Sequence, residues 1–167
     1  MRAITGTLAL VAIGWCGAAM ASDPLPLPQG PVLLTVAGAI NETNVPGEAR
    51  FDRAMLERLG HDRIRTTTPW TDGVRSFDGI KLKTVLDRVG AHGVRVTASA
   101  LNDFTATIPI EDLRYEPILA MAMDGRVLTR RDRGPLWIVY PRDAYEILMD
   151  SRFEDRWVWQ AKRLDVQ

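Results

Sequence analysis

Polar and aromatic side chains gather in three stretches of the sequence, each at the end of a predicted strand. The first, IRTTTPWTDGV at 64–74, is a β-branched run that a proline breaks, with Trp70 beside a short polar turn at 71–73. The other two are SALNDF at 99–104 and TRRDRGPLW at 129–137. Because loops at strand ends commonly carry binding residues, these stretches predict a pocket.

Side chains that could act as nucleophiles or metal ligands are scarce throughout the sequence. Cys16, the single cysteine, lies in a segment that we expect to be removed, which excludes thiolate chemistry and cysteine-ligated metals from the mature chain. His61 and His92 are isolated beside turn glycines, without the spacing of metal ligands. Ser99 or the threonines at 66–68 offer a hydroxyl nucleophile, but there is no G-x-S-x-G elbow and no histidine with an orienting partner. We therefore expect no catalytic residue and no metal site.

The N-terminal region has the features of an exported protein. Residues 1–21 carry one basic residue, an apolar run and the small-x-small end Ala19-Met20-Ala21, which predicts a secretory signal peptide. The alternative, a membrane anchor, needs roughly 20 apolar residues, and the run is shorter. Residues 22–31 hold four prolines and predict an extended lead, followed by one domain at 32–167. We expect a periplasmic protein that does not insert into the membrane after cleavage.

Composition narrows the class of protein further. Without residues 1–21, which contain Arg2 and no acid, 20 basic residues (21 minus 1) face 21 acidic residues, a formal charge of −1. This balance does not suggest nucleic acid as a partner. A hydrophobic content of 46% is enough for a core.

The elements that must position the three stretches are mainly strands. Hydrophobic patterning and turn residues predict strands at 32–40, 61–68, 94–98, 104–108, 118–123, 127–128, 136–140 and 156–166. A first helix is expected after the cap Asp52 and before Gly60, and a second over 82–89. Asp124-Gly125 suits a tight hairpin. This mixed, strand-rich order with short helices indicates an α+β fold.

Several motifs, taken in order, resemble one known family. They are TPWTDG, FDGIKLKTVLDRVGA, TASALNDFTATIPIEDL, ILAMAMDGRVL and RDRGPLWIVYP. Together they resemble the oxidoreductase molybdopterin-binding domain, the sulfite-oxidase fold, in its small exported single-domain form, from about Val32 to the C-terminus. In catalytic members the resemblance implies a cysteine that binds molybdenum, and alignment on Trp70 places that position at Thr66, within one or two residues. A threonine hydroxyl cannot supply a soft thiolate, so we do not expect a molybdenum cofactor.

The resemblance then implies a pocket for a pterin as the ligand. A pterin offers two flat faces and an edge of adjacent N–H donors, so its site needs an aromatic platform, a carboxylate and a few polar partners. The candidates are Trp70, Phe104 and Tyr140 as platforms, Asp72 and Asp103 as carboxylates, Thr66, Thr67 and Asn102 at the edge, and Arg130, Arg131 and Arg133 toward a phosphate or polar tail. Each also has a simpler interpretation as a core lid, a turn or a solvated loop. Trp137, Trp157 and Trp159 are expected to pack in the core.

We therefore expect a non-catalytic, periplasmic module that binds a pterin and signals to a membrane sensor. The control of cyclic di-GMP by such a sensor rests on the resemblance alone. Two alternatives stay open, a molybdenum-cofactor-dependent oxidoreductase that tolerates another ligand, and a structural interaction domain with a vestigial pocket. A neighbouring gene for a membrane protein with cyclase or phosphodiesterase domains would favour the first interpretation, and a haem-binding membrane subunit the oxidoreductase.

Overall fold

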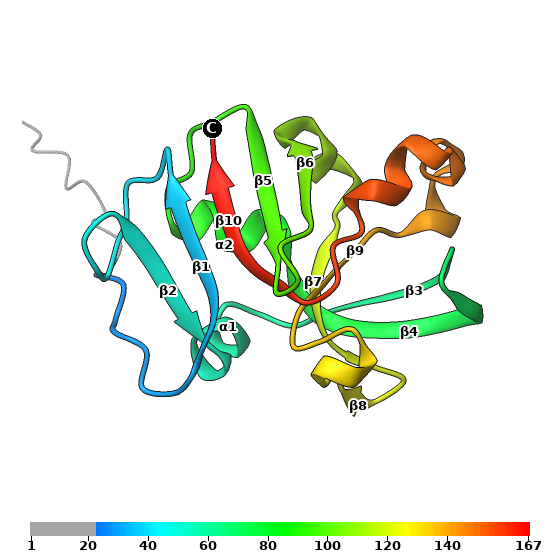
Figure 1. Cartoon of the computed structure of the whole chain (residues 1–167), viewed down its shortest axis with the longest axis horizontal. Helices are drawn as coiled ribbons and strands as arrows, with labels where there is room; N and C mark the ends of the chain where they lie inside the picture. The colour runs from blue at the N-terminus through cyan, green and yellow to red at the C-terminus, as the bar shows by residue number, and fades with distance from the viewer. Residues whose placement is uncertain (1–22) are drawn as a thin grey trace, which may run out of the picture.

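Two five-stranded β-sheets make up most of the computed structural model, which describes residues 23–167 (Figure 1). The predicted signal peptide at 1–21 lies outside the described residues. Within residues 23–167, no helix is long and apolar enough to cross a membrane.

The first sheet contains both the first and the last strand of the domain. Its order is β2-β1-β10-β5-β6, with β1 at Val32–Gly38, β2 at Glu48–Asp52, β5 at Arg95–Ala100, β6 at Thr105–Pro109 and β10 at Ala161–Val166. Only β1 and β10 pair in parallel, and the other neighbours in this sheet are antiparallel. Figure 1 shows β10 in the middle of the sheet, with the C-terminus beside β1 and β5.

The second sheet carries the stretch around Trp70. Its order is β3-β4-β7-β8, and β9 also pairs with β7; the strands are β3 at Asp62–Thr68, β4 at Thr71–Lys81, β7 at Ile118–Met123, β8 at Arg126–Val127 and β9 at Trp137–Val139. All of its pairings are antiparallel. The hairpin between β7 and β8 turns at Asp124-Gly125, where both residues have positive φ, as the sequence predicts.

Within residues 23–167 the helices are short, and two of them are α-helices. They are α1 at Arg53–Arg58, α2 at Leu82–Arg88, and the 3₁₀ segments η1 at Ile110–Tyr115, η2 at Arg130–Asp132, η3 at Arg142–Ala144, η4 at Glu146–Met149 and η5 at Ser151–Arg156. The Asp52 carboxylate caps α1 by accepting the Met55 N–H at 2.8 Å. The buried stripe of α2, Leu82, Val85 and Leu86, packs into the common core. The α+β architecture is therefore the one that the sequence predicts.

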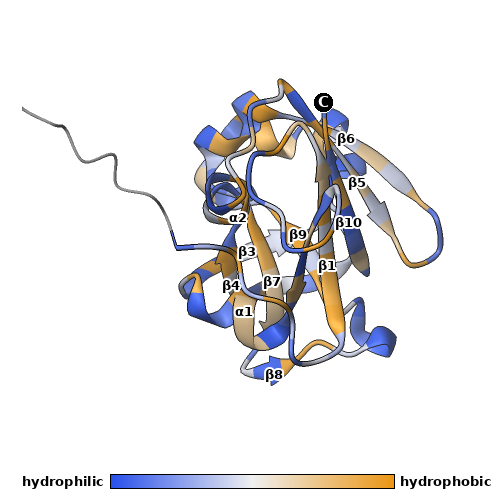
Figure 2. Ribbon diagram, turned by 90° about the vertical axis from the view of Figure 1, so that its left-hand side faces the viewer, coloured by the Kyte–Doolittle hydropathy of each residue, from blue (hydrophilic) through white to orange (hydrophobic). Residues whose placement is uncertain are grey.

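One hydrophobic core serves both sheets. Its largest fully buried side chains include Trp137, Tyr140, Phe51 and Phe77. Figure 2 shows hydrophobic colouring along much of β1 and β7. Every tryptophan of the described residues joins one edge-to-face cluster, in which Trp70 contacts Trp157 and Trp159.

Three sequence expectations were wrong. No strand was predicted between 40 and 61, yet Glu48–Asp52 forms β2, in which Ala49 and Phe51 bury one face of a short strand. The polar turn expected at 71–73 belongs to β4, and the hairpin turns at Pro69 and Trp70 instead. Trp157 and Trp159 precede β10 rather than lying within it.

The proline-rich lead has no helix or strand at 23–31, yet it packs against the domain. The Leu25 side chain is buried in the core. The N–H groups of Gln29 and Gly30 both donate to the Asp52 carboxylate, at 2.7 and 2.8 Å. The same carboxylate thus fixes the lead and the start of α1.

Candidate ligand-binding site

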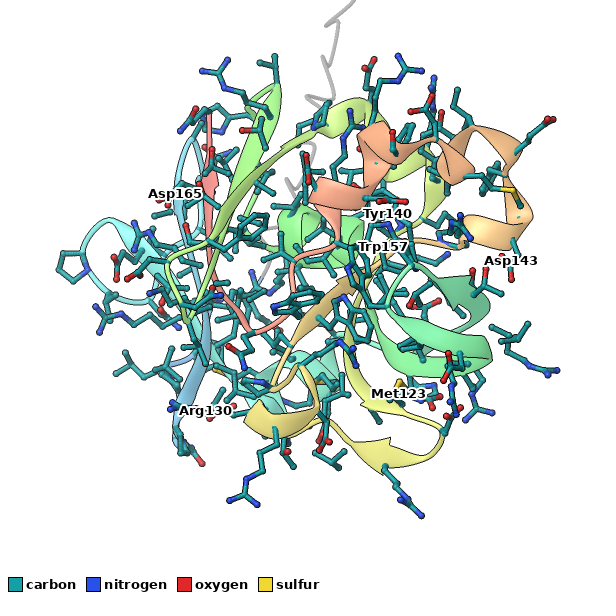
Figure 3. All side chains as sticks on the ribbon, turned by 45° about the vertical axis from the view of Figure 1, so that its right-hand side comes forward. Met123, Arg130, Tyr140, Asp143, Trp157 and Asp165 are labelled. Atoms are coloured by element: carbon teal, nitrogen blue, oxygen red, sulfur yellow. The ribbon has the colours of Figure 1, made fainter. Side chains whose placement is uncertain are left out.

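A cavity of about 650 Å³ opens between the first half of β4, the β7–β8 hairpin and the loop after η2. It is lined by Trp70, Thr71, Asp72, Arg75, Met123, Asp124, Arg126, Val127, Leu128, Asp132 and Arg133. We call it the Trp70 pocket. Figure 3 shows Met123 between the ribbons of β4 and the β8 hairpin. Of the residues predicted to bind a ligand, the pocket brings together Trp70, Asp72 and Arg133.

A bulge in β4 presents Asp72 to this cavity. Thr66 pairs with Arg75 and Thr68 pairs with Thr71, so the segment 72–74 of β4 faces Thr67 alone on β3. Gly73 within the bulge has a φ of 65°, which favours glycine. Bulges of this kind re-aim side chains beside functional sites. Asp72 is exposed, and among residues 23–167 it makes no ion pair.

Neighbouring polar groups hold Trp70 in place. Thr68 Oγ1 accepts the Trp70 N–H at 3.1 Å, and Arg133 Nη2 donates to the Trp70 carbonyl at 2.9 Å. The Arg133 guanidinium lies over the rings of Trp137 and Trp159, 5.3 and 5.7 Å from their centroids. The half-buried Trp70 ring therefore has a fixed backbone and one side packed on the tryptophan cluster.

The far end of the pocket is charged. The Asp124 carboxylate accepts the Ser76 N–H at 3.0 Å and an Arg75 Nη1 bond at 3.1 Å. The Ser76 N–H, together with Arg75, holds the pKa of Asp124 below its usual range. Arg75 Nε is shielded from solvent and has no acceptor in the part of the chain that the structure describes. Arg126 and Arg133 are the other two cations of the lining.

Thr66 and Thr67 do not line the Trp70 pocket. Thr66 is 0% exposed, and its Oγ1 accepts the Asp143 N–H at 3.1 Å and donates to the Thr67 carbonyl at 3.2 Å. Thr67 N–H donates to Asp143 Oδ2 at 2.7 Å, and the Thr67 hydroxyl donates to Asp143 Oδ1. We call these contacts the Thr66–Asp143 clamp. Thr66 and Thr67 were expected at the edge of the pterin site, but η3 lies against both of them instead.

Three of the residues predicted to bind a ligand, Asn102, Asp103 and Phe104, lie in the loop between β5 and β6, away from the Trp70 pocket. Asp103 pairs with Lys162 at 2.9 Å, and Asn102 Oδ1 accepts the Phe104 N–H at 3.2 Å in a local turn. Phe104 is 44% exposed and borders a different hollow with Arg152 and Arg156. None of the three lines the Trp70 pocket.

Arg130 and Tyr140 also differ from expectation. Arg130 lines another hollow, of about 480 Å³, beside β1 and β10, and Figure 3 shows it on the opposite side of its loop from Met123. The Tyr140 ring is 0% exposed and packs on Phe153 and Trp157, so it cannot serve as a ligand platform in this conformation. Burial raises the pKa of Tyr140 well above its usual range, and its hydroxyl donates to Asp112 at 3.0 Å. Arg131 does not line the Trp70 pocket.

Sequence reasoning missed the contribution of the β7–β8 hairpin. Met123, Asp124, Arg126 and Leu128 line the pocket because the hairpin docks beside β4. The Asp124-Gly125 signal predicted the hairpin itself. Its neighbour β4 was not predicted, so the sequence offered nothing to bring the hairpin to Trp70.

Comparison with models of known protein families identifies the family of this domain. The model of the "Oxidoreductase molybdopterin binding domain" matches residues 53–144, more than half of the chain. The chain belongs to this family. The match includes β3, β4 and the β7–β8 hairpin, so the Trp70 pocket is built almost entirely from the family region of this molybdopterin-binding domain.

Comparison with solved structures agrees with the family. The sulfane dehydrogenase SoxCD from Paracoccus pantotrophus is similar, with a TM-score of 0.60 and 17% sequence identity over 80% of this chain. At this identity the likeness shows the fold alone. The aligned region is 37% of the SoxCD chain, so this domain spans about a third of that protein's length. Comparison with curated protein sequences gave no match.

The residues at the position that the resemblance gives for the metal ligand do not fit molybdenum. Thr66 offers a neutral hydroxyl whose donor and acceptor are both used inside the clamp. Its neighbours Thr67 and Thr68 are likewise engaged, with Asp143 and with Thr71 and Trp70. Within residues 23–167 no three His, Cys, Asp or Glu side chains are grouped as metal ligands. The Trp70 pocket, in contrast, has the aromatic and carboxylate groups that a pterin ring requires.

Proposed function

We propose that this molybdopterin-binding domain binds a pterin in the Trp70 pocket, and that the binding is a signal rather than a step of turnover. The observation that supports this most is the pairing of an aromatic ring, Trp70, with an unpaired carboxylate, Asp72, in a cavity of about 650 Å³. Cavities of about 300–1,000 Å³ hold most small ligands. Family membership supports a pterin-type ligand.

In the proposed complex, each part of the pterin meets a different side chain of the pocket. The ring stacks on the free side of Trp70, and Asp72 accepts two parallel bonds from the N–H edge. The Arg75 and Arg126 side chains, which both line the cavity, face the polar substituent. Stacking contributes about 0.5–1.5 kcal/mol beyond area burial, and each charge-assisted hydrogen bond about 1.5–3 kcal/mol. Micromolar affinity is therefore a reasonable expectation.

The lining supports binding without turnover. Among the described residues around the Trp70 pocket there is no histidine, cysteine or lysine to act as a nucleophile or a general base near neutral pH. Asp124, the most engaged acid of the lining, already serves Ser76 and Arg75. A bound ligand would thus be held rather than converted.

Signalling needs a partner, and we propose the periplasmic domain of a membrane sensor that controls cyclic di-GMP. This part rests on the resemblance of the chain to exported pterin-binding regulators and on the predicted signal peptide at 1–21. Export is tested by fractionating cells that produce the full chain, where a shortened product in the periplasmic fraction is expected. A product that stays in the cytoplasm at full length would refute it.

Titration calorimetry with reduced and oxidised pterins tests the binding proposal. Tryptophan fluorescence gives a second readout, because every described tryptophan lies in the cluster that Trp70 joins. Trp70→Ala should weaken binding at least about tenfold, which is 1.4 kcal/mol, while circular dichroism shows a folded domain. Phe104→Ala is the matched control, since this exposed ring lies outside the pocket, and it should leave the affinity unchanged.

Two other experimental outcomes would favour the alternative functions. About one molybdenum per chain, in protein from a host that makes the cofactor, would favour an oxidoreductase. Absence of binding below about 1 mM for every pterin would favour a structural interaction domain with a vestigial pocket.

A further inference from the structure

The Thr66–Asp143 clamp lies where the family resemblance places the metal-ligating cysteine. We infer that in this chain η3 closes that position, so that a hydroxyl stands in place of the thiolate and η3 lies over it. The inference concerns the end of β3 and is independent of pterin binding in the Trp70 pocket.

The clamp uses every polar group that Thr66 and Thr67 can offer toward η3. Thr66 Oγ1 accepts the Asp143 N–H, and Thr67 gives both its N–H and its hydroxyl hydrogen to the Asp143 carboxylate. Arg142 Nη1 reaches Thr67 Oγ1 at 3.3 Å. Figure 3 shows Asp143 on the η3 side of the molecule, apart from Met123 of the Trp70 pocket.

The bulge in β4 explains why Thr67 is available for this role. Thr67 faces the bulged segment 72–74 and has no paired residue on β4. Thr67 is half-buried and its N–H has no paired residue on β4, so its hydrogen bond must go to water or to an acceptor outside the ladder. The Asp143 carboxylate provides it, and a carboxylate that accepts two bonds from one residue holds η3 firmly against β3.

A cysteine at position 66 would therefore remain covered. Cysteine and threonine have similar volumes, and the Thr67–Asp143 bonds do not involve the replaced atoms. The Asp143 N–H would lose a good acceptor, because sulfur accepts hydrogen bonds more weakly than a hydroxyl oxygen. The new thiol would still lie beneath η3. Release of η3 requires a change at Asp143.

Thiol reactivity tests the clamp directly. In the full chain with Cys16→Ser, the variant Thr66→Cys carries a single thiol, and its reaction rate with a colorimetric disulfide reagent reports how well η3 covers it. Adding Asp143→Ala should accelerate the reaction about tenfold or more, and Asp143→Asn, which keeps one acceptor, should give an intermediate rate. Glu146→Ala, an exposed acid in η4, is the control and should change nothing.

Two further measurements keep the outcome interpretable. Amide exchange of Thr67, compared with a core amide such as Leu119, should rise about tenfold in Asp143→Ala while the core amide keeps its protection. Elemental analysis of Thr66→Cys, produced with the cofactor, should give no stoichiometric molybdenum. A fast-reacting Thr66→Cys thiol in folded protein, an Asp143→Ala rate equal to the parent rate, or about one molybdenum in Thr66→Cys alone would each overturn the inference.

Discussion

Trp70 is the residue at which packing and recognition meet. Its indole ring is held edge-to-face by Trp157 and Trp159, with centroid distances of 5.8 and 5.3 Å, and its carbonyl is bound by Arg133. A ring that is already fixed loses little conformational entropy when a ligand stacks on it. The tryptophan cluster therefore serves binding indirectly, through the one ring that borders the cavity.

Asp72 and Asp103, the two carboxylates predicted to bind the N–H edge of a pterin, lie in different parts of the structure. Asp72 lies in the Trp70 pocket, whereas Asp103 is paired with Lys162 at the end of the first sheet. Asp72→Asn should weaken pterin binding by about 10–100-fold, since a charge-assisted bond contributes about 1.5–3 kcal/mol. Asp103→Asn should bind like the parent. Titration calorimetry on both variants decides the matter, and equal losses would place the ligand outside the Trp70 pocket.

At the scale of elements, bulges and turns decide which side chains meet. The β4 bulge turns Asp72 toward the cavity and leaves the Thr67 N–H without a partner on β4. One irregularity therefore positions both a pocket carboxylate and the residue that binds η3. A second irregularity lies between Asp78 and Gly79, where β4 meets β7. Close backbone approach follows there.

Gly79 allows that approach. A Cβ at this position would lie 2.0 Å from the Leu119 carbonyl oxygen and 2.7 Å from the Ala120 Cα, both backbone atoms that cannot move alone. Gly79→Ala should lower the free energy of unfolding by about 1–3 kcal/mol, measured by urea denaturation. Gly30→Ala, where the nearest atom is 3.6 Å away, is the control and should be nearly neutral.

Asp52 makes the start of α1 sensitive to acid. Bonds from the Met55 N–H, and then from Gly30 and Gln29, hold the pKa of Asp52 below its usual range. Because the folded pKa is below the unfolded one of about 3.9, its contribution is complete above that value and is lost as pH falls through the folded pKa. The stability gap between the parent and Asp52→Asn should therefore narrow on acidification below about pH 4. A gap that stays constant in denaturation at decreasing pH would contradict this.

The sequence was most informative where a signal is local. The Asp52 cap, the Asp124-Gly125 hairpin and the proline after Thr68 each fix a few residues by their own chemistry, and the structure confirms them. The β4 strand escaped prediction because Asp72, Gly73 and Val74 are all exposed and give no alternating pattern. The role of Asp143 was equally hidden, since it acts through a contact with Thr67, which is 76 residues away in the chain. Arg126 borders the cavity because the β7–β8 hairpin lies beside β4.

At the scale of the whole molecule, a buried polar group ties distant segments together. Asp112 of η1 is 3% exposed, and its Oδ2 accepts the Tyr140 hydroxyl at 3.0 Å and Arg156 Nη1 at 2.6 Å. Arg156 also lies over the Phe153 ring, 4.4 Å from its centroid. The last turn of η5 is thereby joined to η1 and to the end of β9.

Removing the centre of this network should be costly. Asp112→Ala leaves the Arg156 guanidinium, whose side chain is 22% exposed, and the Tyr140 hydroxyl without their acceptor. The loss of one partner of a fully buried ion pair costs about 3–5 kcal/mol, which is the upper bound for this half-buried pair. Tyr140→Phe removes a single hydrogen bond and keeps the ion pair, so it should cost about 0.5–1.5 kcal/mol. Urea denaturation measures both. Similar losses in the two variants would mean that the Arg156 pair contributes little.

The parallel pairing of β1 with β10 sets the order in which the fold can be completed. Thr35 lies opposite Arg163, a separation of 128 residues (163 minus 35), and β10 separates β1 and β2 from β5 and β6. A chain emerging N-terminus first cannot join the two halves of this sheet until its final strand is available. Such long-range closure slows folding and leaves open strand edges meanwhile. The nascent chain therefore leaves this sheet incomplete until β10 has been synthesised.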